Sequence, residues 1–147
     1  MKTVLVFLFM LTFSCKSQQN VSEQVNRSNG LELIIQDEYY FTDKPETLVI
    51  KDDKSLKTLF SKINRTRKPG IPIPKIDFTK EVILVASMGE KAMSELPNLI
   101  ILNQSEVQIE IGIQFNESSN KKSSTITYPF CVYKMPLSEN EVIFSRL

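Results

Sequence analysis

The chain contains no histidine among its 147 residues. Histidine is the commonest general base and the commonest metal ligand of proteins, so its absence removes every Cys-His and Ser-His catalytic arrangement. The sequence also lacks a glycine-rich phosphate loop and a nucleophile elbow. The remaining carboxylate pairs, Asp77 with Glu81 or Glu95, are typical of turns and surfaces. We therefore predict that the protein is not an enzyme and needs no metal or cofactor.

Cysteine is also scarce, and the two cysteines need different explanations. Cys15 ends an apolar leader, whereas Cys131 lies inside a late apolar run. One thiol cannot build a zinc site, and if Cys15 is modified then Cys131 has no partner for a disulfide. A lone thiol in apolar surroundings is typical of inert core packing.

The chain also has no large excess of positive or negative charge. There are 18 basic and 17 acidic residues, and removal of Lys2 with the leader leaves 17 of each. Nothing in the overall charge therefore points to nucleic acid. A local basic loop spans residues 62–75, with Arg65, Arg67 and Lys68 near its centre. Proline and glycine interrupt this loop, which favours a solvated segment over a patch for phosphate or an acidic partner.

The leader predicts attachment to a membrane. Val4 to Phe13 is apolar but too short to span a bilayer, and Ser14-Cys15 follows at once. This arrangement resembles the lipobox of bacterial lipoproteins, in the looser form of Bacteroidetes-type bacteria, because Thr12 replaces the usual leucine. The resemblance implies cleavage before Cys15 and a palmitate-type lipid anchor on its sulfur. The alternative is an ordinary secretory leader in which Cys15 has no role.

Three segments are expected. Residues 1–14 form the signal peptide, residues 15–30 the lipidated cysteine and a flexible polar linker, and residues 31–147 a β-rich domain. No acidic run follows Cys15, and in lipoproteins of that bacterial group such a run is associated with surface display. We therefore expect a protein of the cell envelope, anchored to the outer membrane and facing the periplasm.

The domain is predicted to be α+β and mostly β, because short apolar runs dominate and one helical stripe occurs. Val82 to Ala86 is unbroken and β-branched, which indicates a strand buried on both faces. Residues 53–63 carry apolar side chains at i, i+3, i+4 and i+7, which predicts one amphipathic helix capped by Asp52 or Asp53.

About seven strands are expected in a largely antiparallel, twisted sheet that curls into a sandwich or partial barrel. The first two strands are expected to form a hairpin, and Pro129 is expected to mark an edge or a bulge. Residues 90–97 are predicted to be irregular and residues 116–124 to form a hairpin loop. The predicted strands cover residues 31–36, 47–51, 82–86, 99–102, 107–115, 125–135 and 141–144.

Several of these motifs together resemble the PrcB C-terminal domain family. The resemblance covers about residues 31–147 and rests on four segments: Ile76-Asp77-Phe78-Thr79-Lys80-Glu81, Met88-Gly89-Glu90-Lys91, Thr127-Tyr128-Pro129-Phe130 and the closing Val142-Ile143-Phe144. It implies a small non-catalytic accessory protein, with Asp77, Phe78 and Gly89 as framework residues. The family usually carries Thr-Gly-Gly-Tyr soon after that glycine. Met93-Ser94-Glu95-Leu96 stands here instead, and without the glycines a positive φ becomes costly.

Two functions follow as hypotheses. The first is an accessory or interaction module for another envelope protein, with a protease among the candidate partners. Its predicted surfaces are the basic loop and a candidate partner-binding loop. That loop contains Glu90, Lys91, Met93, Ser94, Glu95 and Leu96. The alternative is a periplasmic lipoprotein that binds a small ligand or glycan on a concave sheet face. Its predicted lining is Tyr39, Tyr40, Tyr128 and Tyr133.

Overall fold

The computed structural model describes residues 30–93, 95–115 and 122–147, so the leader, Cys15 and nearly all of the linker lie outside the described residues. Its centre is a four-stranded antiparallel sheet in the order β1-β8-β3-β2. These strands are β1 (Glu32–Asp37), β2 (Glu46–Ile50), β3 (Glu81–Ser87) and β8 (Phe130–Pro136).

Strand β3 lies between β2 and β8 and is buried on both faces, as predicted from its apolar run. Val82, Leu84 and Ala86 point to one core, while Ile83 and Val85 point to the other. A strand with both faces covered needs no polar alternation, which explains its continuous apolar sequence.

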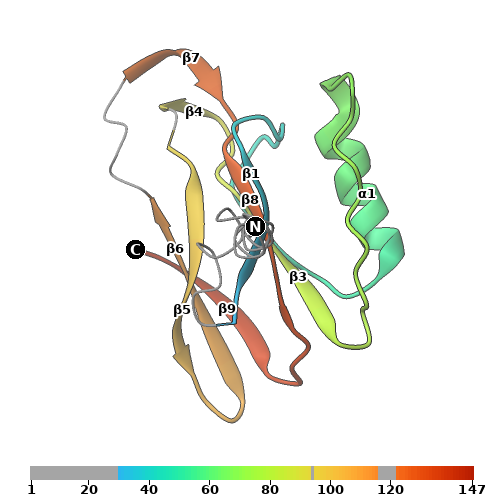
Figure 1. Ribbon diagram of the computed structural model, residues 1–147. Helices are drawn as coiled ribbons and strands as arrows, with labels where there is room; N and C mark the ends of the chain where they lie inside the picture. The colour runs from blue at the N-terminus through green and yellow to red at the C-terminus, as the bar shows by residue number, and fades with distance from the viewer. Residues whose placement is uncertain (1–29, 94, 116–121) are drawn as a thin grey trace, which may run out of the picture.

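A three-stranded sheet covers one face of the central sheet (Figure 1). It consists of β5 (Pro97–Gln104), β6 (Gln108–Phe115) and β9 (Glu141–Arg146). Strands β5 and β6 are antiparallel, but β6 and β9 are parallel. Side chains of β6, such as Ile109, Ile111 and Ile113, fill the core between the two sheets.

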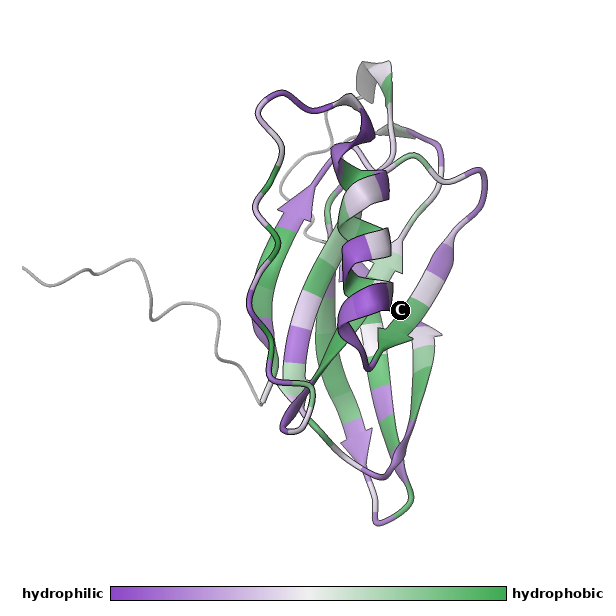
Figure 2. Ribbon diagram, turned by 90° about the vertical axis from the view of Figure 1, so that its right-hand side faces the viewer, coloured by the Kyte–Doolittle hydropathy of each residue, from purple (hydrophilic) through white to green (hydrophobic). Residues whose placement is uncertain are grey.

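Helix α1 (Asp53–Ile63) covers the other face, with the predicted bounds (Figure 2). Asp52 caps it by accepting a hydrogen bond from the Ser55 amide at 2.8 Å. The predicted stripe is buried against the sheet and forms the second core. Its members are Leu56, Leu59, Phe60 and Ile63. A short 3-10 helix, η1 (Asn64–Thr66), continues from it.

Over the described residues the architecture is thus mostly β with one α-helix, antiparallel-dominated and not closed into a barrel. The predicted hairpin of the first two strands is wrong. Strand β1 pairs with β8 and β2 pairs with β3, so the two strands occupy opposite edges of the sheet. Because β3 and β8 carry the most continuous apolar runs, they take the centre and separate the earlier strands.

Two further boundaries differ from the prediction. The segment after Gly89 contains β4 (Lys91–Met93), which pairs with β7 (Lys122–Thr127). The predicted long strand over residues 125–135 is two strands, β7 and β8, separated at Tyr128 and Pro129. Proline cannot donate to a ladder, and Pro129 therefore lies at this break, where its carbonyl accepts from the Met88 amide at 2.9 Å.

The remaining differences concern counts and coverage. The nine strands of the described residues exceed the seven expected. Most of the hairpin loop predicted at 116–124 lies outside the described residues, and β7 begins within the predicted loop.

The two ends of the central sheet have different neighbours. Gly30 and the start of β1 lie at one end, where Glu32 pairs with Lys134. At the opposite end, the chain after β1 meets β4, β7 and η1 (Figure 1). The candidate site lies at that second end.

Candidate functional site

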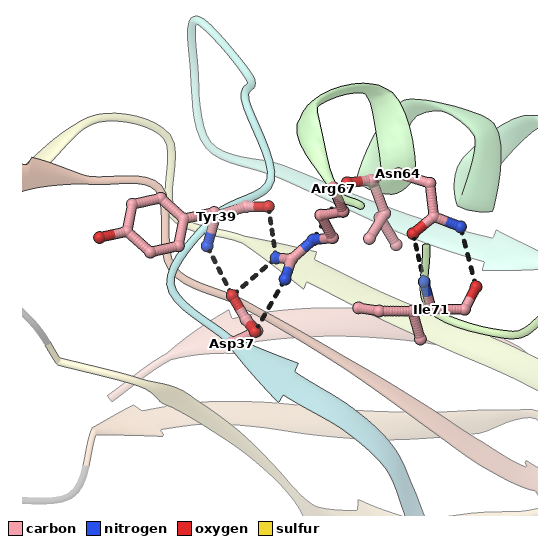
Figure 3. Close-up of polar contacts among 6 residues, drawn as sticks. Asp37, Tyr39, Asn64, Arg67 and Ile71 are labelled. Atoms are coloured by element: carbon pink, nitrogen blue, oxygen red, sulfur yellow. Dashed lines mark hydrogen bonds and ion pairs between the residues drawn. The ribbon is translucent and has the colours of Figure 1, made fainter. Parts of the chain in front are cut away.

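Arg67 ties the end of β1 to the segment after the helix (Figure 3). Its guanidinium donates to the Asp37 carboxylate at 2.7 and 3.2 Å, and to the Tyr39 carbonyl oxygen at 2.9 Å. Its Nε donates to the Ile63 carbonyl oxygen at 3.2 Å. Burial raises the pKa of the Asp37 carboxyl, but the hydrogen bonds from Arg67 and the Tyr39 amide outweigh it and hold that pKa below its usual range. Arg67 is therefore engaged within the fold.

The basic loop is held in place by Asn64. Its amide nitrogen donates to the Ile71 carbonyl oxygen at 2.8 Å, and its side-chain oxygen accepts from the Ile71 amide at 2.7 Å. Arg65 and Lys68 remain exposed on this loop. Of the three residues named for the candidate basic loop, only these two are exposed.

An exposed aromatic group lies beside Arg65. The Phe41 and Tyr128 rings lie 4.7 Å apart between centroids, and the Arg65 guanidinium lies 5.9 Å from the Phe41 centroid. The Tyr128 hydroxyl donates to the Glu90 carboxylate at 3.3 Å. Phe41 is 43% exposed and Tyr39 41% exposed. We call Tyr39, Phe41 and Tyr128, with Arg65 and Glu90 beside them, the aromatic end.

Backbone pairing explains this presentation. Tyr39 forms a parallel bridge with Tyr128, and the Tyr40 amide donates to the Tyr128 carbonyl oxygen at 3.0 Å. In extended chain successive side chains point to opposite faces, so Tyr40 is buried while Tyr39 and Phe41 face outward. The sequence does not show this alternation, because Tyr39, Tyr40 and Phe41 are three consecutive aromatic residues.

The four tyrosines of the ligand hypothesis do not share one surface. Tyr40 lies in the core under α1, where its ring meets Phe130 at 5.5 Å, and Tyr133 lies in the core between the sheets. Only Tyr39 and Tyr128 belong to the aromatic end. The predicted concave tyrosine lining is therefore not assembled.

The candidate partner-binding loop is divided. Glu90 and Lys91 are exposed, whereas Glu95 and Leu96 are half-buried. Met93 ends β4, and Ser94 lies outside the described residues. The side chain of Glu90 joins this loop to the aromatic group through its hydrogen bond with Tyr128.

The three proposed framework residues make contacts suited to that role. Gly89 has φ +64°, and a Cβ there would lie 3.0 Å from the backbone of Lys44 and Pro45. Asp77 accepts from the Thr79 amide at 3.1 Å in the turn before β3. Phe78 packs against the core under α1.

The carboxylates considered for catalysis have separate partners. Asp77 pairs with Lys80 at 3.2 Å, and Glu81 pairs with Lys134 at 3.1 Å. Among the described residues, no group of three or more metal-ligating side chains is found. Cys131 is fully buried, and burial raises the pKa of its thiol to about 12, so it stays protonated at neutral pH.

No family model matches the chain, and neither a curated protein nor a solved structure matches it. Across the part of the chain that the structure describes, no helix is long and apolar enough to cross a membrane.

Proposed function

We propose that this chain is a non-catalytic, lipid-anchored protein of the cell envelope that acts as an accessory module for another envelope protein. One observation carries the interaction role: aromatic side chains stand exposed beside Arg65 at the aromatic end. Exposed aromatic residues and arginine dominate the binding energy of many protein interfaces. A protease remains among the candidate partners, through the family resemblance.

The direction of the chain supports this role. Gly30, which follows the linker, lies at one end of the central sheet, and the aromatic end lies at the other. A lipid on Cys15 would thus leave the aromatic end pointing away from the anchored end of the domain. The segment from Cys15 to Gly30 reaches at most about 50 Å when extended, which allows the domain to stand clear of the lipid headgroups.

Site-specific photo-crosslinking in the native host tests the interaction. A crosslinker at Phe41 is expected to yield a reproducible adduct with one envelope protein, and Arg65→Glu should abolish it. The matched control is a crosslinker at Val107, which is 74% exposed in the turn between β5 and β6 at the opposite end. Equal adducts from both positions, or none from Phe41, would contradict the proposal.

The anchor is tested separately by metabolic labelling with palmitate. Label is expected in the wild-type chain and not in Cys15→Ala. If the wild-type protein takes up no label, the lipid anchor is contradicted. The crosslinking experiment does not depend on this result.

Glycan binding is a second candidate, because Tyr39 and Phe41 are exposed beside charged side chains that can bond sugar hydroxyls. Titration of the protein with envelope glycan fragments, followed by tyrosine fluorescence, separates the two functions. A saturable response lost in Tyr39→Ala would favour the glycan.

A further inference from the structure

Strand β2 leaves one backbone edge open. It is the last strand in the order β1-β8-β3-β2, and among the described residues it pairs only with β3. Its five residues, Glu46–Ile50, contain no proline, and its pairing with β3 shows no register shift. Such an edge presents unpaired N–H and C=O groups to any chain that can run beside it.

A groove of about 630 Å³ runs between this edge and α1. Its floor is apolar and is formed by Leu48, Ile50 and Leu59, among others. Its wall on the helix side carries Lys54, Thr58 and Lys62. These three are spaced by four residues, so they form one stripe along α1.

The groove is basic. Lys51, Lys54 and Lys62 line it, and Asp52 is its one acidic residue. Asp52 already accepts hydrogen bonds from the Ser55 amide at 2.8 Å and hydroxyl at 2.7 Å. The lysines therefore set the charge that an incoming segment meets, and they favour carboxylates.

The spacing of the lysines matches an extended peptide. Lys54 and Lys62 are eight residues apart on the helix, which places their Cα atoms about 12 Å apart. Two side chains on the same face of a strand, at positions i and i+4, are about 13 Å apart. An acidic side chain at each of these positions can thus meet one lysine each.

We propose that the groove between β2 and α1 binds an extended acidic segment of a partner protein, which adds as a strand to β2. Its backbone pairs with the open edge, two carboxylates four residues apart meet Lys54 and Lys62, and apolar side chains rest on the floor. None of the residues of the aromatic end lines this groove, so the inference does not depend on the function proposed above.

Other occupants fit less well. Two copies joined through their β2 edges would bring the lysines of both grooves together, and like charges repel. Residues 16–29 of the chain itself carry one carboxylate, Glu23, against Lys16 and Arg27, and so cannot supply the acidic pair. A polyanion without a peptide backbone would leave the open edge unpaired.

Fluorescence polarisation of the full mature chain in detergent tests the inference. The probe is a labelled peptide of alternating valine and threonine with glutamates at positions i and i+4. We expect saturable binding that weakens at least tenfold in the double variant Lys54→Glu, Lys62→Glu. The matched control is Lys57→Glu, on the same helix but outside the groove, and it should change affinity less than twofold.

Two peptide controls separate strand addition from charge alone. A peptide with glutamates at i and i+3 places them on opposite faces and should bind at least fivefold more weakly. N-methylation of the backbone nitrogens on one edge should also weaken binding, and hydrogen exchange should slow at β2 amides.

Equal weakening by Lys57→Glu, or equal binding of both peptides, would show non-specific charge attraction and overturn the proposal. Self-association through β2, seen as a dimer without peptide, would overturn it as well. Circular dichroism of each variant shows that it is folded. Because Arg65→Glu should leave peptide binding unchanged, failure here is distinguishable from failure of the proposed interaction at the aromatic end.

Discussion

The two outer strands of the four-stranded sheet meet their surroundings in different ways. Side chains of strand β1 bind other parts of the fold, as when the side-chain amide nitrogen of Gln36 donates to the Pro97 carbonyl oxygen at 2.9 Å. The pairing of β1 with β8 shifts register between Leu33 and Ile35. Its last residue, Asp37, is held by Arg67. Among the described residues, strand β2 has one such contact, in which the Tyr40 hydroxyl donates to the Glu46 carboxylate at 2.8 Å, and a basic groove lies beside its edge.

This difference separates two means of stabilising an edge. At β1 polar side-chain contacts fix the strand to the second sheet and to the segment after η1. On the β2 side the helix covers the sheet through apolar side chains, while the backbone edge stays accessible. Substitutions on the β2 side should therefore act through packing, and substitutions on the β1 side through charge and hydrogen bonding.

The largest expected loss in the free energy of unfolding comes from a substitution on the β2 side. Leu59 is 3% exposed and forms part of the groove floor. Leu59→Ala should lower the free energy of unfolding by about 3 kcal/mol, because it removes buried apolar contacts and leaves a cavity. Urea unfolding at pH 7 measures this loss.

The neighbouring residue provides the control. Thr58→Ala, on the exposed side of the same turn, should change stability by no more than about 0.5 kcal/mol. A loss at Leu59 no larger than the loss at Thr58 would show that the helix contributes little to this side of the sheet.

How far the sequence predicts this architecture depends on how local each signal is. The helix was predictable to its ends, because its apolar stripe and the Asp52 cap both lie within eleven consecutive residues and their flank. The double burial of β3 was also predictable from one apolar run. The partner of each strand was not predictable. The alternating apolar pattern of β1 or β6 is compatible with many neighbouring strands, and their actual partners β8 and β9 lie elsewhere in the chain.

The candidate site was predicted in part for the same reason. Arg65 and Glu90 were each singled out by residue type, but only the fold brings both to Phe41 and Tyr128. The role of Arg67 was hidden, since its partner Asp37 is thirty residues away in the chain. The groove beside β2 was equally hidden, because it exists only once β2 becomes an edge.

An intermediate effect is expected on the β1 side. Arg67→Ala should lower the free energy of unfolding by about 2 kcal/mol, because it leaves the Asp37 carboxylate without its charged hydrogen-bond donor. Arg65→Ala removes only an exposed contact with Phe41 and should cost about 0.5 kcal/mol. Urea unfolding measures the loss in each variant, and equal losses would show that the contact between Arg67 and Asp37 does not stabilise the end of β1.

The smallest expected effect is on the pH dependence of the free energy of unfolding, through Asp37. The pKa of Asp37 is raised by burial but lowered more strongly by its hydrogen bonds, so it lies below the unfolded value of about 3.9. The stabilisation from its charged form is therefore complete above about pH 5 and is lost as pH falls through the folded pKa. Asp37→Asn should cost about 1 kcal/mol at pH 6, and urea unfolding should show this difference from wild type shrinking at about pH 3.

The difference between variant and wild type isolates Asp37 from other carboxyl groups whose pKa is also lowered, such as those of Asp52 and Asp77. Both groups are present in each protein, so their contributions to the pH dependence cancel. Leu59→Ala, which removes no charge, is the control from the β2 side and should cost the same at both pH values. In the Arg67→Ala background the effect of Asp37→Asn should decrease, since the charged donor is gone. A loss at Asp37 that is independent of pH would show that hydrogen-bond geometry, and not charge, holds Arg67 at the end of β1.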